Sequence, residues 1–333
     1  RKIKILGTSY NSIDLAEDRD RFQRLVKALN LNQPENAIVN SFREAKNVLN
    51  LIRYPVVVRP SYVLGGRSMK IIYNVKELEE YFLHESNKKY GSILIDKFLR
   101  EAKEIDVDAI CDGQSVYIAG ILEHIEEAGI HSGDSACTLP PQTITENILN
   151  RIKESTNKIA LKMNIIGYIN IQFAIKDDQI FLIEVNPRAS RTIPFVAKAT
   201  GEDLAKISTK VIMGNKLNDF NLQNKNSNFV CVKESVFPFD RFPEEDTVLG
   251  PEMKSTGEVM GIDKTYQMAF AKSQISSGNN LPKSGTVFIS VKNEDKENII
   301  LMSQILIKLN FIIIATKGTS NYLEKFSIET KKI

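Results

Sequence analysis

Three oxygen-bearing side chains near the middle of the chain could bind a hard metal ion. Gln172 and Glu184 lie on the two arms of an expected hairpin, and Asn186 shares the strand face of Glu184. With residues 177–179 as a three-residue loop, Gln172 falls opposite Glu184. Such carboxylate and amide oxygens suit a magnesium ion that bridges phosphate oxygens. The other face would then consist of apolar side chains, those of Phe173, Ile175, Phe181, Ile183 and Val185.

This metal-site prediction depends on the register of the hairpin. A two-residue loop would move Gln172 to the opposite face, because side chains alternate along a strand. The spacing alone is also typical of an ordinary half-exposed hairpin with its polar residues outward, and that interpretation stays open at this point.

Two arginines, Arg188 and Arg191, directly follow the hairpin. Arginine binds phosphate and carboxylate groups through two parallel hydrogen bonds. Beside a metal-binding carboxylate, the pair therefore indicates an anionic substrate. Taken alone, the pattern fits two solvated arginines equally well.

A glycine pair, Gly65 and Gly66, lies in a loop between two expected strands. Glycines let backbone amides approach phosphates closely, and Arg59 and Arg67 would add positive charge. The loop lacks Gly-Lys-Ser/Thr and no helix follows it, so it is neither a Walker A loop nor a Rossmann turn. A Gly-Gly pair is also common in a simple tight turn.

A second loop, residues 128–135, holds more small and polar residues than a spacer needs. It contains His131, although a lone histidine is more often structural, as we expect for His84. Cys137, which follows the loop, is expected to be a buried small hydrophobe.

The periodicity of apolar residues predicts a mixed α/β protein that positions these groups. In residues 104–109, Glu104, Asp106 and Asp108 share one strand face and apolar residues occupy the other. The expected strands are residues 4–6, 56–59, 69–73, 92–98, 104–109, 115–122, 167–175, 180–186, 229–237, 286–291 and 311–315, and the expected helices are residues 14–29, 42–52, 75–85, 145–163, 201–213 and 296–309.

Composition narrows the class of protein. The 333 residues are 42% hydrophobic and 26% charged, ordinary values for a globular protein, with no apolar run of membrane-spanning length. A net charge of +3 is too small to indicate a nucleic-acid partner. The three cysteines are far apart, which argues against a disulfide framework or a zinc site and predicts a cytoplasmic protein.

Several motifs in one order resemble the ATP-grasp unit of the carbamoyl phosphate synthetase large chain. They are Glu17-Asp18-Arg19, residues 58–67, Glu123-His124-Ile125-Glu126 with residues 129–135, Glu184-Val185-Asn186-Pro187-Arg188, Pro251-Glu252-Met253 and residues 255–261. The resemblance implies an ATP-grasp fold, in which two sheet-containing subdomains clasp ATP.

The resemblance also implies roles for individual residues. Arg19, Arg59 and the loop of Gly65, Gly66 and Arg67 would contact the ATP phosphates. The adenine edge would lie near Lys97 and Leu99, with the ribose on Glu104. The loop Gly129, Ile130, His131 and Ser132 would line the nucleotide pocket. Gln172, Glu184 and Asn186 match the Mg²⁺ (or Mn²⁺) ligands, and Arg188 and Arg191 match groups that hold the phosphorylated substrate.

The family's large chain contains two synthetase units, of which the first phosphorylates bicarbonate and the second phosphorylates carbamate. Two features favour the second unit. The loop at residues 64–67 has a short glycine run, and an α/β module similar to the family's allosteric domain follows the core. The resemblance implies partners: a glutaminase small subunit, the first synthetase unit, carbamate and an allosteric effector, but neither nucleic acid nor membrane.

Four regions are expected on this basis. Residues 1–30 would end a domain that precedes the ATP-grasp domain, and residues 31–214 would form the ATP-grasp domain itself. Residues 215–280 would extend the synthetase unit. Residues 281–333 would begin a Rossmann-like allosteric domain similar to methylglyoxal synthase, so we expect a segment of a longer protein. Two alternatives remain: another ATP-grasp carboxylate ligase, or a catalytically inactive nucleotide-binding fragment.

Overall fold

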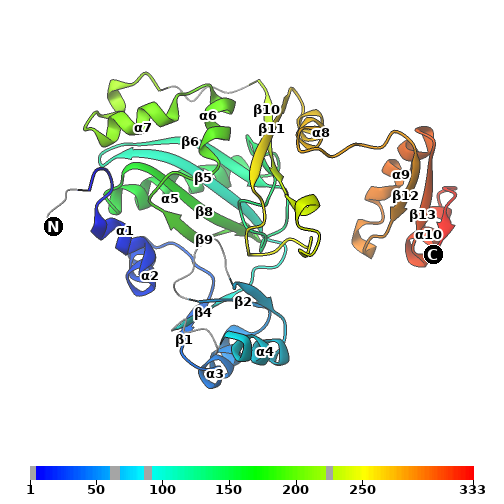
Figure 1. Ribbon diagram of the computed structural model, residues 1–333, viewed down its shortest axis with the longest axis horizontal. Helices are drawn as coiled ribbons and strands as arrows, with labels where there is room; N and C mark the ends of the chain where they lie inside the picture. Colours follow the sequence, from blue (N-terminus) through cyan, green and yellow to red (C-terminus); the bar gives the residue numbers. More distant parts are fainter. Residues whose placement is uncertain (1–4, 61–67, 86–91, 223–227) are drawn as a thin grey trace. The chain divides into compact units, whose positions relative to one another are not determined.

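The computed structural model describes residues 5–60, 68–85, 92–222 and 228–333. The chain divides into two compact units, Arg1–Ser277 and Gly278–Ile333, and each is described by itself (Figure 1). No helix in these described ranges is long and apolar enough to cross a membrane.

The first unit is built on a seven-stranded sheet in which every neighbouring pair is antiparallel. Its strands, in spatial order, are β11 (Gly257–Asp263), β10 (Val230–Val236), β7 (Cys137–Leu139), β6 (Val116–His124), β5 (Lys103–Asp112), β8 (Ile166–Lys176) and β9 (Gln179–Asn186). The predicted alternation in β5 is confirmed, because Ile105, Val107 and Ala109 all join one buried apolar cluster.

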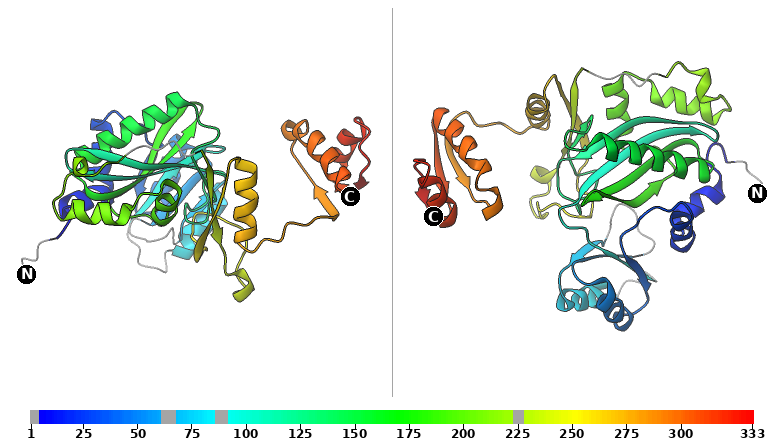
Figure 2. Two further views of the ribbon diagram at one scale, coloured as in Figure 1. Left: turned by 90° about the horizontal axis from the view of Figure 1, so that it is seen from above. Right: turned by 180° about the vertical axis from the view of Figure 1, so that it is seen from behind.

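The long helix α5 (Glu146–Lys162) covers that apolar face of the sheet (Figure 2). Helix α2 (Arg19–Ala28) contributes Phe22, Leu25 and Val26 to the same cluster. We predicted one helix over residues 14–29, and this was wrong. The chain forms α1 (Tyr10–Glu17) and α2 instead, because the Asp18 side chain accepts a hydrogen bond from the amide of Arg21 and caps a new helix.

The opposite face of the sheet is covered only in part. Helices α6 (Ile193–Thr200) and α7 (Leu204–Ile212) pack there on β5, β6 and β8. The prediction of one helix at residues 201–213 missed α6, which Gly201 separates from α7 by adopting a left-handed conformation with φ of 72°. The remaining part of this face carries polar side chains and becomes the candidate site.

A smaller antiparallel sheet lies in residues 36–97, in the order β1 (Asn36–Val39), β4 (Ile93–Lys97), β2 (Val56–Pro60) and β3 (Lys70–Ile72). Helices α3 (Phe42–Ile52) and α4 (Val75–Glu85) occupy the residues predicted for them and pack on this sheet around the buried Leu49 and Leu78. Strand β1 was missed, because four residues are too short to show a clear alternation.

Strand β11 and helix α8 (Tyr266–Ser276) were also not predicted. They pack so closely that a Cβ atom on Gly261 would lie 2.0 Å from the carbonyl oxygen of Ala269. Glycine at this position lets the helix rest directly on the strand. The pair closes the edge of the large sheet beside β10.

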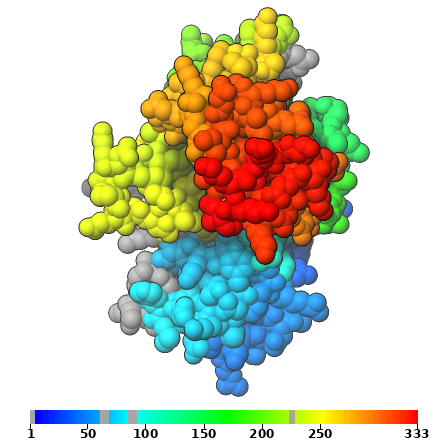
Figure 3. All heavy atoms as spheres, turned by 90° about the vertical axis from the view of Figure 1, so that its right-hand side faces the viewer, coloured from blue at the N-terminus to red at the C-terminus, as the bar shows by residue number. Residues whose placement is uncertain are grey.

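The second unit has its own small parallel sheet, β12 (Gly285–Ile289), β13 (Phe311–Ala315) and β14 (Lys331–Lys332), with helices α9 (Asn298–Lys308) and α10 (Lys317–Glu324). Figure 3 draws the surface of this unit in orange to red. Its core consists of Ile289, Ile299, Ile313, Leu323 and Ile328. The strand–helix–strand order predicted for residues 286–315 is confirmed.

Candidate nucleotide and metal site

The hairpin β8–β9 brings the predicted metal ligands together on the uncovered face of the sheet. Gln172 pairs with Glu184, as predicted, and Asn170 pairs with Asn186. The Nδ2 atom of Asn186 donates to Oε1 of Glu184 at 2.8 Å. The amide of Asn186, itself a predicted metal ligand, therefore holds the Glu184 carboxylate in place.

The loop that produces this pairing differs from the prediction. Lys176 pairs with Gln179, so the turn has two residues, Asp177 and Asp178, both with positive φ. A bulge between Leu182 and Glu184 then inserts one extra residue, Ile183, and restores Gln172 opposite Glu184. The predicted apolar face was correspondingly wrong in part: Leu182 and Ile180 replace Phe181 and Ile183 in the core.

Positive charge reaches this hairpin from the small sheet. Arg59 on β2 places Nη1 3.9 Å from Oε2 of Glu184, and its Nε lies 3.3 Å from Oδ2 of Asp96 on β4. Burial raises the pKa of Asp96, although Arg59 and Arg19 oppose that shift. The contacts of Arg59 with Asp96 and Glu184 join the small sheet to the β8–β9 hairpin, which we call the metal hairpin because it carries the predicted ligands.

Arg19, the first residue of α2, belongs to the same group of charges. Burial and the nearby Arg59 lower its pKa, while Asp96 and Glu184 act in the opposite direction. Its Nε atom is buried and has no hydrogen-bond partner among the described residues. A buried donor without a partner is costly, and a phosphate oxygen would satisfy it.

The loop at residues 129–135 lies across the uncovered face of the sheet. Its Gly129 amide donates to Oε1 of Glu104 at 3.2 Å, and Ser132 Oγ accepts from Nε2 of Gln172 at 2.9 Å. Gly129 has φ of 100°, and a Cβ atom there would lie 2.7 Å from the Phe98 ring. Glycine is therefore required where this loop meets the end of β4.

His131 stabilises the loop from within. Its Nδ1 accepts from the Gly133 amide at 3.0 Å, and burial lowers its pKa below the ordinary value. The Gly250 carbonyl accepts from the His131 amide. Ile130 and Leu99 are both partly buried, and Lys97 directs its ammonium to the carbonyls of Arg53 and Tyr54.

The two predicted substrate arginines have different surroundings. Arg188 is exposed, and its Nη2 donates to Oδ1 of Asn186 at 3.1 Å, which places it beside the metal hairpin. Arg191 turns towards Ser255 and Glu258, with distances of 3.2 Å to Oγ and 3.5 Å to Oε1. Of these two arginines, Arg188 is the one that donates a hydrogen bond to the hairpin.

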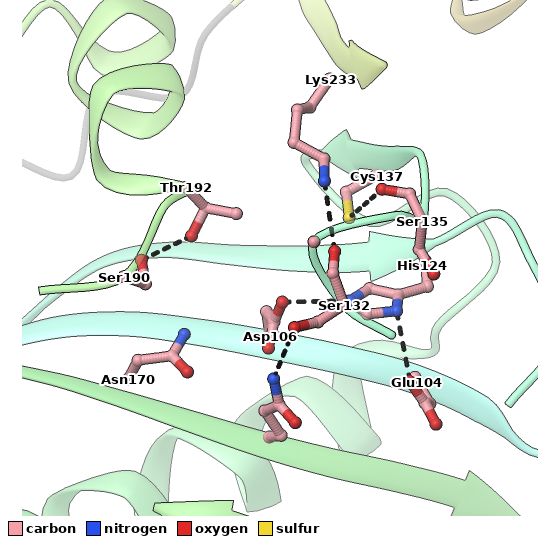
Figure 4. Close-up of polar contacts among 12 residues, drawn as sticks. Glu104, Asp106, His124, Ser132, Ser135, Cys137, Asn170, Ser190, Thr192 and Lys233 are labelled. Atoms are coloured by element: carbon pink, nitrogen blue, oxygen red, sulfur yellow. Dashed lines mark hydrogen bonds and ion pairs between the residues drawn. The ribbon is translucent and has the colours of Figure 1, made fainter. Parts of the chain in front are cut away.

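Several buried polar residues around the site were missed by the sequence interpretation. His124 lies between Glu104 and Asp106, at 3.4 and 3.1 Å (Figure 4). Burial alone would lower the pKa of His124, but Cys137, Asp106 and Glu104 raise it well above the ordinary value. Lys233 is fully buried and donates to the Ser132 carbonyl at 3.3 Å. Cys137 itself is buried, as predicted.

The glycine pair Gly65 and Gly66, together with Arg67, lies outside the described residues. Its predicted contact with phosphate therefore remains an expectation.

The donor set fits a magnesium nucleotide better than a metal held by protein alone. No group of three or more His, Cys, Asp or Glu side chains within the described ranges could hold a metal. Glu184 offers one carboxylate, and Gln172 and Asn186 offer amide oxygens. Magnesium is commonly bound by one or two carboxylates together with substrate phosphates, which matches this sparse arrangement.

Comparison with known families agrees with this geometry. Residues 18–220 match the family described as "Carbamoyl-phosphate synthase L chain, ATP binding domain". The carbamoyl phosphate synthase large chain of Archaeoglobus fulgidus is 53% identical over 335 residues, which cover 99% of this chain and 31% of the relative. That of Methanobrevibacter smithii is 52% identical, covering 99% and 32%. The chain thus spans about a third of the length of these relatives.

Solved structures with low identity share the fold. The biotin carboxylase domain of 2-oxoglutarate carboxylase from Hydrogenobacter thermophilus, in complex with MgADP and bicarbonate, has a TM-score of 0.63 at 18% identity, covering 77% of this chain and 63% of the other. An ADP complex of the N5-carboxyaminoimidazole ribonucleotide synthetase purK has a TM-score of 0.63 at 13% identity, covering 79% and 71%. The fold is therefore the mixed α/β ATP-grasp fold.

Proposed function

Because the chain belongs to the family of the carbamoyl-phosphate synthase L chain ATP-binding domain, we propose that it phosphorylates carbamate with ATP. One observation carries the proposal. A single face of the sheet joins the oxygen ligands Gln172 and Glu184 to the guanidinium of Arg59, 3.9 Å from Glu184. Such a face can hold a metal-bound triphosphate between two sheets.

In the proposed step, a carbamate oxygen attacks the γ-phosphorus of ATP. The bond from that phosphorus to the bridging oxygen breaks, and ADP leaves while carbamoyl phosphate forms. Phosphoryl transfer needs alignment and neutralisation of charge more than covalent help from the protein. Arg19 and Arg59 would neutralise the phosphates, and Arg188 would hold the substrate beside Asn186.

Magnesium or manganese, when bound, would supply positive charge that neutralises the phosphates. Glu184, Gln172 and Asn186 would hold it. The ribose hydroxyls would bind Glu104, whose carboxylate is oriented by the Gly129 amide and His124. Lys97, Leu99 and the loop of Gly129, Ile130, His131 and Ser132 would line the nucleotide pocket.

We assign the chain to the second, carbamate-phosphorylating unit rather than to the bicarbonate-phosphorylating one. The short glycine run at residues 64–67 supports this assignment. So does the separate α/β unit Gly278–Ile333 that directly follows the first unit and would belong to an effector-binding domain. The proposed partners are the first synthetase unit, a glutaminase subunit that supplies ammonia, and an allosteric effector.

The reverse reaction tests the proposed function. ADP, magnesium and carbamoyl phosphate are mixed with the chain, and ATP formation is followed with a coupled assay. We expect ATP formation that depends on both the metal and carbamoyl phosphate. Equal activity with acetyl phosphate would instead favour a different carboxylate ligase, and no ATP with either donor would favour a nucleotide-binding segment without activity.

A further inference from the structure

A fully buried carboxylate, Asp108, lies at the centre of the large sheet on the same face as the site. Three side chains donate hydrogen bonds to it. Asn170 Nδ2 and Ser190 Oγ donate to Oδ1 at 3.0 and 2.7 Å, and Thr192 Oγ1 donates to Oδ2. No metal ligand or substrate arginine of the proposed site touches Asp108 among the described residues.

Two of the three donors come from the segment that carries the substrate arginines. Ser190 and Thr192 flank Arg191 in sequence, and Ser190 follows Arg188 by two residues. Their hydroxyls also lie 2.7 Å apart (Figure 4). We call residues 187–192 the arginine segment, and Asp108 binds it to strand β5 of the large sheet.

The Thr192 hydroxyl binds Asp108 and does not cap the helix that follows. It occupies the N-cap position of α6, where a threonine side chain commonly accepts a hydrogen bond from a backbone amide of the first turn. No such cap bond forms, and the hydroxyl donates to Asp108 instead. The third donor, Asn170, pairs across the hairpin with Asn186, so the same carboxylate also contacts the base of the metal hairpin.

We propose that Asp108 is a positioning residue that fixes the arginine segment against the metal hairpin and so sets the affinity for the phosphorylated substrate. The inference rests on the proposed function, because it assigns Arg188 and Arg191 to that substrate. Asp108 would touch neither nucleotide nor substrate. Its effect would pass through Ser190 and Thr192 to the two guanidiniums.

A role in stability alone does not explain why a carboxylate is fully buried at position 108. An apolar side chain would fill the same place without the cost of burying a charge, which only well-placed donors offset. Burial raises the pKa of Asp108 to about 6, against the hydrogen bonds from Thr192, Ser190 and Asn170 that favour the charged form. The protein therefore keeps an unfavourable group at a point where two hydroxyls of the arginine segment bind the sheet.

The test separates positioning from stability through two Michaelis constants. Thr192→Val and Ser190→Ala each remove one hydroxyl with little change in volume. ATP formation from ADP and carbamoyl phosphate is measured for both variants. We expect the KM for carbamoyl phosphate to rise roughly tenfold or more, because small misplacements of substrate-binding groups are costly. The KM for ADP should stay within about twofold, since no proposed nucleotide contact changes.

Two controls accompany these variants. Thr192→Ser keeps the hydroxyl and should restore most of the affinity for carbamoyl phosphate. Thr200→Val removes a hydroxyl from the same helix, where it donates to the Val196 carbonyl and accepts from the Glu202 amide, and should leave both constants unchanged. The melting temperature of every variant is recorded, so that loss of folded protein is distinguished from loss of affinity.

The outcomes are distinct. If the unchanged chain makes ATP and the hydroxyl-free variants alter only the melting temperature, or raise both Michaelis constants together, the positioning role is wrong and the proposed function stands. If the unchanged chain makes no ATP from carbamoyl phosphate, the proposed function fails and the inference fails with it. A selective rise in the KM for carbamoyl phosphate, reversed in Thr192→Ser, supports both.

Discussion

Charge at the metal hairpin is distributed over residues from four elements. Glu184 supplies the negative group, Arg59 faces it from β2, and Arg19 adds a second guanidinium from the start of α2. Asp96 partly balances the two arginines. Two arginines against two carboxylates give this group a formal charge of zero, and a metal ion bound to Glu184 would make it positive. This arrangement favours the binding of a metal-bound polyphosphate rather than a free metal ion.

Glu184→Gln should therefore remove metal-dependent catalysis and leave the fold intact. The side chain is 39% exposed, so its loss removes little packing. We expect the rate of ATP formation to fall by at least about a hundredfold, as for loss of one charged group that acts on the reacting phosphate. The melting temperature should change by no more than about 2 °C. The matched control, Glu146→Gln, alters an exposed carboxylate on α5 and should keep full activity.

Asp108 should make stability depend on pH. Its pKa rises to about 6 in the folded protein, whereas an unfolded aspartate has a pKa of about 3.9. The folded state thus binds more protons between these values. Relative to Asp108→Asn, the unchanged protein should lose roughly 2–3 kcal/mol of stability as pH rises from about 4 to about 6, and no more above about 7.

Urea unfolding of both proteins at several pH values checks this dependence. A stability difference that stays constant from pH 4 to pH 7 would show that Asp108 is not an ionising buried group.

The site was predictable at some residues and not at others. Gln172 and Glu184 could be paired from the alternation of two adjacent strands, and the correct pairing emerged although the turn length was wrong. Asp96, His124 and Lys233 gave no such signal. The partners of each residue come from segments distant in sequence. Only the folded sheet brings them together.

At the scale of elements, the turn and the bulge of the β8–β9 hairpin have opposite effects on its register, and these effects cancel. Its two-residue turn has Asp177 and Asp178 at φ of 50° and 58°, which is the geometry of a type I′ turn. By itself that turn would put Glu184 out of step with Gln172. The bulge at Ile183 corrects the register and turns Glu184 to the uncovered face.

Asp178→Gly should stabilise this hairpin without changing its chemistry. Glycine adopts positive φ freely, and Asp-Gly is a preferred sequence for this turn. We expect a gain of about 0.5 kcal/mol, and the contact from Arg151 to the backbone carbonyl of residue 178 should persist. The measurement is a shift in the urea midpoint of unfolding. A loss of stability, or a change in the KM for ADP, would contradict the role given to the turn.

Elements with strong periodicity were predicted well, including α3, α4 and α5. The errors arose where local signals were ignored or weak. Asp18 is a good N-cap residue and could have divided the first helix. Strand β11 and helix α8 depend on the contact between Gly261 and Ala269, which no sequence pattern reveals.

At the scale of the whole molecule, the two units have separate cores. The five-residue core of the second unit includes no residue before Ile289. The intervening residues 278–284 are exposed throughout. Separate cores joined by an exposed segment are typical of independently folding domains.

Cutting the chain in this segment should leave the first unit folded. A specific protease sequence inserted after Lys283, followed by cleavage, is expected to leave its melting transition unchanged within about 2 °C. Calorimetry before and after cleavage measures this. Unfolding of residues 1–277 upon cleavage would show that the first unit needs the second for its stability.

The central claim is that this chain phosphorylates carbamate rather than bicarbonate. The most direct measurement compares two partial reactions of the same preparation, ATP formation from ADP with carbamoyl phosphate and ATP hydrolysis that depends on bicarbonate. We predict the first reaction, abolished in Glu184→Gln, and a second reaction no faster than ATP hydrolysis without bicarbonate. Bicarbonate-dependent hydrolysis without ATP formation from carbamoyl phosphate would contradict the assignment.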